Sequence, residues 1–428
     1  MPQFSPWNKC LENAALSDVG LRRANNQDSY TVFLAGNQQD YLRRGHLFMV
    51  ADGMGAHAAG ELASKIATDV VPLTYQKLRD KSPPDALLAA LVDANNQIHT
   101  RGQAGPEFKG MGTTSTALVL LPHGVLLAHV GDSRAYRVRG QKIDQLTFDH
   151  SLVWELQASG QKYEEPISNF IGKNIITRSL GPNQNVQVDL EGPHPCQPGD
   201  TFLLCTDGLT GQVQDEEIGA VLICLPPAEA AQALVDLANL RGGPDNITVV
   251  CARVSGPQVV QDANGQPADA SENKNLRPVH PLIWTVFGIT ALAAVGFLAI
   301  GRWTAAIVSL LAAALSGIMA LVRRYGAEDE TPSPDSRHFG RGPYVTCDCA
   351  PNEGFVIKLI EIIDQLRDAS QSENWKIDWS RFNQFLAQAD AARASTDYTA
   401  SARQYLRAIS FVMAELKRQR PHDDEISN

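Results

Sequence analysis

Four short aspartate-containing segments, far apart in the sequence, constrain the fold of this chain more than any other feature. They are Asn25–Asp28, Ala51–Gly55, Thr206–Gly208 and Pro244–Asn246. An aspartate beside glycine or asparagine at a strand end places a carboxylate where the backbone can approach a bound ion closely. One metal site could collect these carboxylates. Because the segments bring no cluster of His or Cys ligands, they favour a hard cation, Mg²⁺ or Mn²⁺, over Zn²⁺ and indicate hydrolytic metal chemistry.

The overall composition excludes several other classes of protein. A chain of 428 residues is long enough for two or three domains, and 44% hydrophobic with 20% charged residues is typical of a folded protein. The formal net charge of −10 argues against nucleic acid as a partner, because a phosphate backbone requires a basic surface. The seven cysteines are odd in number and form no CxxC pair, so neither a disulfide framework nor a zinc ribbon is expected.

The first part of the chain, about residues 14–254, alternates strand-like and helical segments. Expected strands are His46–Val50, Gly124–Val130, Thr201–Cys205 and Ile247–Cys251, and expected helices are Gly60–Val70 and Asp85–His99. Taken by itself, this alternation favours a parallel α/β fold. A segment rich in Pro, Gly, Asp, Asn and Gln follows, so we expect a first domain at residues 1–256 and a linker at 257–280.

Two apolar segments come next, Pro281–Ile300 and Thr304–Val322, and only three residues separate them. Each is close to the ~20 residues that a spanning helix needs, and neither contains a charge. Lys274 and Arg277 precede the pair, and Arg323 and Arg324 follow it. The positive-inside rule therefore predicts a two-helix transmembrane hairpin over 281–322 in the inner (cytoplasmic) membrane, with both flanks in the cytoplasm. A re-entrant hairpin and a buried hairpin in the core of a soluble domain are the alternatives.

The C-terminal part is expected to contain a linker at 323–352 and a small all-α domain at 353–428. Its first helix has one apolar face, formed by Phe355, Leu359, Ile362, Ile363 and Leu366. A second helix is expected around 382–392 and a third over 398–418. The third looks like part of a tetratricopeptide-like unit, and a plain three-helix bundle is the alternative. Either arrangement could bind a protein partner.

Several motifs of the first domain follow one another along the chain. They are Arg23-Ala24-Asn25-Asn26-Gln27-Asp28, Asp52-Gly53-Met54-Gly55, Gly110-Met111-Gly112-Thr113-Thr114, Gly131-Asp132-Ser133-Arg134, Asp207-Gly208-Leu209 and Asp245-Asn246. In this ordered set the chain resembles the metal-dependent serine/threonine protein phosphatases of type 2C, in their bacterial branch, over about Leu16–Val254. The resemblance implies protein-serine/threonine phosphatase activity and an α+β fold. That fold is a four-layer α/β/β/α sandwich of two antiparallel sheets with metal ions at one end.

The resemblance also assigns metal ligands. Asp52 would bridge two Mn²⁺ or Mg²⁺ ions, with the carbonyl of Gly53 completing one shell. Asp207 and Asp245 would bind one ion, and Asp132 together with Asp207 would form a third, weaker metal site. Two neighbouring ions can lower the pKa of a bridging water and clamp a phosphate, which is what hydrolysis of a phosphate monoester requires.

Other side chains are assigned to the phosphate and to water. Arg23 matches the family's phosphate-binding arginine, and a guanidinium fork suits bidentate capture of phosphate. Asp28 would order metal-bound waters. Catalysis is thus expected to depend on Arg23, Asp52, Asp207 and Asp245. His129 and His150 are expected to make hydrogen bonds in the core or loops and not to bind metal.

One departure from the family pattern bears on function. The flap region between Trp154 and Ile175 lacks the usual His-Pro-x-Arg and reads Phe170-Ile171-Gly172-Lys173, which leaves substrate preference open. The favoured function is a membrane-anchored phosphatase acting on phosphoserine and phosphothreonine of cytoplasmic proteins, the products of serine/threonine kinases. The alternative is a catalytically weak membrane scaffold that binds phosphoproteins.

Overall fold

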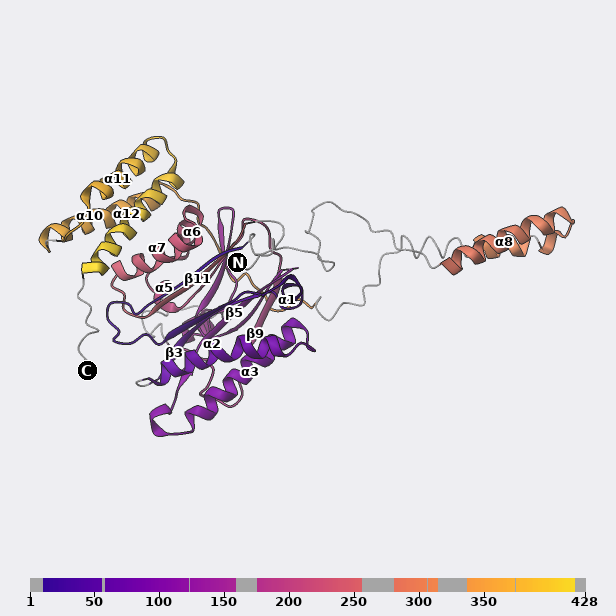
Figure 1. The fold of residues 1–428 in the computed structure, drawn as a ribbon, viewed down its shortest axis with the longest axis horizontal. Coiled ribbons are helices and arrows are strands. Elements are labelled where there is room, and N and C mark those ends of the chain that lie inside the picture. The colour runs from indigo at the N-terminus through magenta and orange to yellow at the C-terminus, as the bar shows by residue number, and fades with distance from the viewer. Residues whose placement is uncertain are drawn as a thin grey trace. The chain divides into compact units, whose positions relative to one another are not determined.

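The computed structural model describes residues 11–55, 58–122, 124–158, 175–255, 281–305, 307–314, 337–373 and 375–419. Two antiparallel sheets lie face to face at its centre (Figure 1). The first has the order β1 (Leu11–Asp18), β11 (Ile247–Val254), β10 (Thr201–Cys205), β7 (Arg134–Arg139), β8 (Lys142–Gln145) and β12 (Val345–Asp348). The second has the order β2 (Asp28–Phe33), β3 (His46–Met54), β5 (Ser115–Leu121), β6 (Gly124–Val130) and β9 (Asp189–His194), with β4 (Gly112–Thr113) beside β3.

The strand pairing corrects one expectation and confirms another. Every described ladder is antiparallel, so the parallel α/β fold favoured by the alternation of segments is wrong. The reason is that strands adjacent in sequence, such as β5 and β6, pair directly through short turns, and the helices cover outer faces instead of crossing between strands. The two antiparallel sheets implied by the family resemblance are confirmed.

The layers follow from the two-residue period of the strands. Along β3, Phe48 and Val50 point between the sheets, where they pack with residues of the first sheet such as Phe202 and Leu204. Leu47 and Met49 point the other way, into the cluster under the helices. Both faces of a central strand are therefore apolar, which is why these strands read as continuous hydrophobic runs.

Helices cover both outer faces. On the second sheet lie α2 (Ala59–Lys77) and α3 (Pro83–Gly102), drawn in purple in Figure 1. On the first sheet lie α6 (Asp215–Cys224) and α7 (Pro227–Leu240). The remaining helices of this part are short: α1 (Gln38–Arg44), the 3₁₀ turn η2 (Pro106–Phe108), α4 (Leu152–Ala158) and α5 (Asp207–Thr210).

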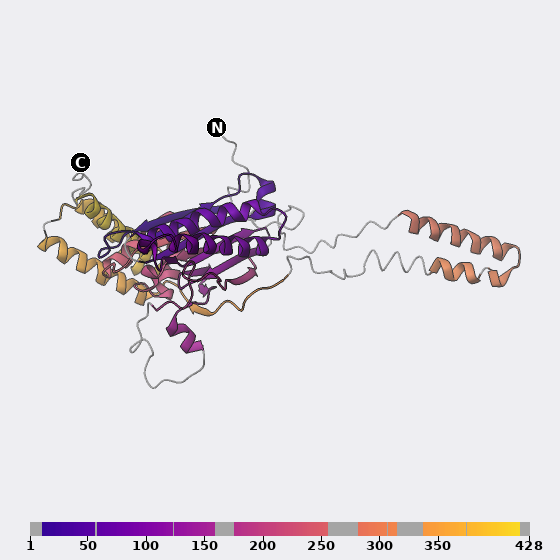
Figure 2. The same ribbon diagram turned by 90° about the horizontal axis from the view of Figure 1, so that it is seen from below.

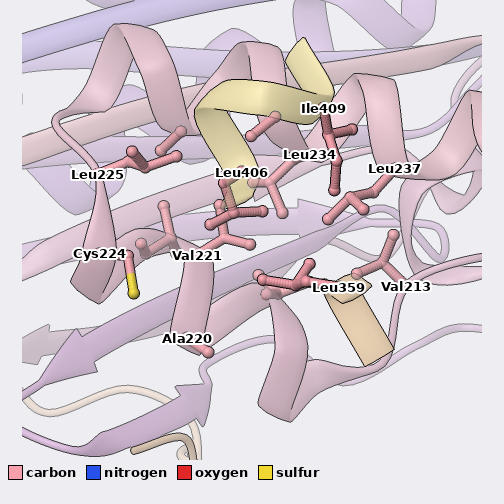
Figure 3. Close-up of a cluster of buried hydrophobic side chains, with 14 of the residues drawn as sticks. Val213, Ala220, Val221, Cys224, Leu225, Leu234, Leu237, Leu359, Leu406 and Ile409 are labelled. Atoms are coloured by element: carbon pink, nitrogen blue, oxygen red, sulfur yellow. The ribbon is translucent and has the colours of Figure 1, made fainter. Parts of the chain in front are cut away.

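The C-terminal helices are α10 (Glu353–Ser372), α11 (Trp379–Ala394) and α12 (Tyr398–Gln419). They lie close to the positions that the sequence predicted. Instead of a separate domain, residues 338–428 form one compact unit with residues 1–268. Leu359, Leu406 and Ile409 of the tail share a buried cluster with Val221 and Leu234 of α6 and α7 (Figure 3). The expected linker 323–352 also contributes β12, which extends the first sheet beside β8. The apolar face of the tail thus packs on this chain's own first domain.

Residues 269–337 form a second compact unit. It contains α8 (Pro281–Ala299), one of the orange helices in Figure 2. No helix within the described residues is both long and apolar enough to cross a membrane, so the structure does not support the expected transmembrane hairpin at 281–322. Residues 315–322 of that hairpin, the linker 257–280 and most of the flap lie outside the described residues.

Candidate metal and phosphate site

The site is built around the end of β3, where the backbone of Asp52 is fixed on both sides. Antiparallel pairing of β2 with β3 sets Asp28 directly opposite Asp52. The amide of Asp52 donates to Thr114 Oγ1 (2.8 Å), and its carbonyl accepts from Thr113 Oγ1 (2.9 Å) and from the amide of Thr114 (2.9 Å). The two threonines therefore fix the strand end from which the carboxylate projects, a role that their presence in a Gly-rich motif did not disclose.

The glycines after two of the aspartates are required by close packing of the backbone. A Cβ at Gly53 would overlap the carbonyl oxygens of Gly60 and Gln27, and the Gly53 amide donates to Gln27 (3.1 Å). A Cβ at Gly208 would overlap the carbonyl oxygen of Asn246. These Asp-Gly pairs are thus not open surface turns; each lets a second segment approach the aspartate.

Asn246 ties together the loops that carry the candidate residues. Its Nδ2 donates to the carbonyls of Val19 (2.9 Å) and Asn25 (3.0 Å), and its Oδ1 accepts from the amide of Gln27 (2.9 Å). The loop of Asp245 is therefore joined to the loop that runs from β1 to Asp28. Sequence reasoning noted Asn246 only as part of a motif and missed this structural role, which no local pattern discloses because all three partners lie more than 200 positions away.

The aspartates come close enough to repel one another. Burial, followed by the charges of Asp28, Asp207, Asp132 and Asp245, raises the pKa of Asp52 well above its usual value. Burial and then the neighbouring aspartates likewise raise the pKa of Asp28 to about 7 and that of Asp132 to about 8. A cluster of buried carboxylates in this state is stabilised by a bound cation, which removes both the repulsion and the cost of burial.

Several carboxylate oxygens have no hydrogen-bond donor among the residues that the structure describes and could bind such a cation. Within the described parts of the chain, the Oδ1 atoms of Asp28, Asp132 and Asp207 are buried without a hydrogen bond, whereas Asp28 Oδ2 accepts from Thr206 Oγ1 (2.8 Å). No three acidic, His or Cys side chains of the described chain are already grouped as a ligand set. Asp245 is paired with Arg23 at the same cluster. Unpaired, all-oxygen donors nevertheless fit Mg²⁺ or Mn²⁺.

Arg23 lies at this cluster, as the sequence predicted. Its Nη2 donates to Asp245 Oδ2 at 2.7 Å, and half of the side chain is exposed. That hydrogen bond raises the pKa of Arg23, and the charges of Asp52 and Asp207 contribute in the same direction. A permanently charged, half-exposed guanidinium beside a carboxylate cluster is placed to bind an anion that the cluster itself would repel.

A cavity of about 710 Å³ opens over the site. Four of the predicted residues line it: Arg23, Asp132, Asp207 and Asp245. Its wall includes Arg134, which binds Asp149 (2.7 Å) and lies 5.7 Å from the ring of Trp154. Sequence reasoning assigned no role to these wall residues.

The hydrogen bonds predicted for the two histidines are present. His129 contacts Thr116 Oγ1 (2.9 Å) and the carbonyl of Phe148 (3.0 Å). The Nδ1 of His150 accepts from the amide of Gly131 (3.0 Å), so its Nε2 carries the proton and donates to Asp189 (2.9 Å). Both rings are used within the core.

Fold and site together define an antiparallel two-sheet sandwich with a buried carboxylate cluster and an arginine at one end. The sequence model of the protein phosphatase 2C family matches residues 22–234. A protein phosphatase 2C-type protein of Streptococcus pyogenes is 39% identical over 54% of this chain and 93% of its own length. Protein phosphatase PhpP of Streptococcus pneumoniae is 38% identical over 56% of this chain and 96% of its own. The chain belongs to the protein phosphatase 2C family and is a protein serine/threonine phosphatase.

Solved structures agree with this assignment. The serine/threonine phosphatase of Streptococcus agalactiae is 36% identical, with a TM-score of 0.51 over 57% of this chain and all of its own. PstP/Ppp of Mycobacterium tuberculosis is also 36% identical, with a TM-score of 0.50 over 57% of this chain and 99% of its own. Metal dependence is typical of the family.

Proposed function

We propose that this chain hydrolyses phosphoserine and phosphothreonine in proteins by a metal-dependent reaction at the aspartate cluster. The observation that carries this proposal is the aspartate cluster beside Arg23: Asp28 lies directly opposite Asp52, and Asp132, Asp207 and Asp245 line one cavity together with Arg23. Substrates of serine/threonine kinases have the matching chemistry, a dianionic phosphate on a flexible protein segment.

Residues for the metal ions and for the phosphate are distinct in this proposal. Asp52, the carbonyl of Gly53, Asp207 and Asp245 would hold two Mn²⁺ or Mg²⁺ ions, and Asp132 with Asp207 a third. When bound, such ions supply an activated water and neutralise phosphate charge. Arg23 binds the phosphate and orients it. Arg23 now pairs with Asp245. Phosphate would replace Asp245 as the partner of Arg23, and a metal ion would replace Arg23 as the partner of Asp245. Asp28, held by Thr206, orients water at the cluster.

The test is phosphate release from a phosphothreonine peptide by the full chain, with Mn²⁺, with Mg²⁺ and with neither. We expect Asp207→Asn to lower kcat/KM by more than about 100-fold, since losing a ligand should exceed the 10–100-fold typical of losing a group that supports one. The rise in Tm that Mn²⁺ produces should shrink as well. Asp69→Asn, in an exposed pair on α2, is the control. Full activity of Asp207→Asn would contradict the site; phosphopeptide binding without turnover by the wild type would support the scaffold instead.

We also propose that residues 281–322 attach the protein to the cytoplasmic membrane, with the catalytic unit in the cytoplasm. In the described part of this segment many large apolar side chains are more than half exposed: Ile289, Leu292, Val295, Ile300, Trp303, Ile307, Val308, Leu310 and Leu311. An apolar surface of this kind calls for a lipid or protein cover. Fractionation of cells that express the full chain or a deletion of 281–322 tests the proposal. Recovery of the full chain in the soluble fraction would contradict it.

A further inference from the structure

The last turn of α12 reaches the loop that carries Arg23. Lys417 Nζ donates to Asp18 Oδ2 at 2.7 Å, across 399 positions of sequence. Asp18 ends β1, and only 18% of its side chain is exposed. Burial by itself raises the pKa of Asp18, but the hydrogen bonds from Lys417 and Asn239 outweigh it and hold the pKa below its usual value. The carboxylate is therefore ionised, and Lys417 is its cation.

The other oxygen of Asp18 fixes the backbone of that loop. Asp18 Oδ1 accepts from the amide of Gly20 (3.0 Å) and from Asn239 Nδ2 of α7 (3.1 Å). Gly20 has φ +78°, which favours glycine, and a Cβ there would overlap the carbonyl oxygen of Asp245. The loop from β1 is thus held in a left-handed turn and pressed directly against the segment that carries the candidate metal ligand.

Arg23 follows two residues after this anchored turn. The amide of Leu21 donates to the carbonyl of Gly243 (2.8 Å), so the two loops remain joined up to that point. Beyond Leu21 the half-exposed Arg23 side chain is fixed by its ion pair with Asp245. A phosphate that replaces Asp245 on the guanidinium would leave Arg23 positioned by its backbone alone. The position of the loop would then determine the geometry of the contact between the arginine and the phosphate.

We propose that Lys417 is a positioning residue for phosphate binding, which acts through Asp18 and the loop 18–21 on Arg23. This inference rests on the proposed role of Arg23. It gives the C-terminal helix α12 a direct part in substrate affinity, in addition to its packing on α6 and α7.

The same helix offers a matched control. Arg407, also on α12, binds Glu229 of α7 with two hydrogen bonds, at 2.7 and 3.1 Å. Both Arg407 and Lys417 thus join α12 to the first domain through a partly exposed ion pair, with 35% and 45% of the cationic side chain exposed. Only Lys417 contacts the Arg23 loop. A general loosening of α12 should follow from either substitution, whereas an effect on phosphate binding should follow from Lys417 alone.

The experiment uses the full chain and measures kcat, the KM for a phosphothreonine peptide and the inhibition constant of inorganic phosphate. We expect Lys417→Met to raise KM and the phosphate inhibition constant about two- to fivefold, the range set by the worth of such ion pairs, with kcat little changed. Lys417→Arg should restore wild-type values, and the effect of Lys417→Met should shrink at high salt. Arg407→Met should leave both constants unchanged.

A double-mutant cycle separates this inference from the role of Arg23 itself. In an Arg23→Ala background, Lys417→Met should cause no further rise in KM, because both act on the same interaction. If Arg23→Ala raises KM but Lys417→Met does not, or if Arg407→Met raises it equally, the positioning role is overturned and the proposed function stands. If Arg23→Ala changes neither constant, the assignment of Arg23 fails, and the inference that depends on it fails too.

Discussion

The two outer faces of the sandwich are covered in different ways. On the second sheet the cover is α2 and α3, which are consecutive in sequence and lie inside the segment matched by the family model. On the first sheet, α6 and α7 form an inner cover, and α12, which packs against α10 and α11, lies on them from beyond residue 338 (Figure 1). A short connection joins the two helices that cover the second sheet. The cover of the first sheet instead brings together residues about 180 positions apart, such as Arg407 and Glu229.

In this chain the cover of the second sheet lies within the segment matched by the family model, whereas part of the cover of the first sheet comes from residues beyond that segment. The outer surface of α6 and α7 carries enough apolar area to accept a third layer, and this chain supplies that layer itself. The tail is then part of the folded unit, because its core is continuous with that of the first domain.

Removal of the tail should have the largest effect. In the full chain, Leu406, Ile409 and Val412 of the tail are at most 1% exposed. A chain that ends at residue 337 lacks these side chains and exposes the residues on which they pack. Burial of each such side chain contributes about 1.5–3 kcal/mol, so Tm should fall further than in any single variant below. Thermal unfolding measures this. Replacement of 269–337 by a Gly/Ser linker is the control, since that segment forms its own unit and its loss should leave Tm unchanged. An equal Tm for the truncated and full chains would show that the tail is a separate domain.

A single leucine-to-alanine change in the core under either cover should lower the free energy of unfolding by a similar amount. Leu87 on α3 and Leu406 on α12 are both completely buried. Each leucine-to-alanine change should lower the free energy of unfolding by about 2–5 kcal/mol, within one cooperative urea transition that takes in both covers. If Leu406→Ala instead produced a separate early transition while Leu87→Ala did not, the tail would unfold independently of the sandwich.

A buried acid under the tail should make the stability of this side depend on pH. Asp236 of α7 is fully buried, and burial raises its pKa to about 6, although Gln232 Nε2 donates to it (2.8 Å). Because the folded-state pKa lies above the unfolded one, this residue's contribution to stability is complete below about pH 4 and is lost as the pH rises through 6. The full loss should reach about 3 kcal/mol, of which about 2 kcal/mol falls between pH 4.5 and 7.5.

The measurement is the free energy of unfolding at pH 4.5 and 7.5 for the wild type and for Asp236→Asn. Other carboxylates titrate in the same range, so the difference between the two proteins isolates Asp236. The wild type should lose more stability than the variant over this interval. An identical pH dependence would mean that Asp236 is not held in its neutral form by the α7 environment.

The same contrast explains what the sequence could and could not predict. The helices and strands were located because their apolar periods are strong, and the aspartates because their motifs occur in order along the chain. Antiparallel pairing came from the family resemblance alone, since the pattern of alternating segments favoured the wrong, parallel fold. The strand β12 was not predicted, because it has only four residues and follows a Pro- and Ser-rich segment. Docking of α12 depends on the match between two surfaces, which no local pattern contains.

The site shows the same division between local and non-local signals. Asp52 and Asp207 could be singled out because their Asp-Gly motifs occur in a fixed order with the other motifs along the chain. The structural role of Asn246 could not be predicted in this way, because its three hydrogen bonds are made to loop residues more than 200 positions away along the chain. Sequence reasoning therefore predicts groups for the chemistry, whose roles stay predictions, and it missed the groups that hold them in place.

The smallest effect distinguishes the ion pairs of the two covers. Lys65 and Asp69 form an i,i+4 pair on α2 with both side chains more than half exposed, so Lys65→Ala should lower the free energy of unfolding by no more than about 0.5 kcal/mol. Arg407 meets Glu229 between α12 and α7 through two hydrogen bonds and is less exposed. Its pair holds two distant segments together, so Arg407→Ala should cost about 1 kcal/mol. Urea denaturation at low and high salt measures both. Equal costs would mean that the contact between α12 and α7 depends on its apolar cluster alone.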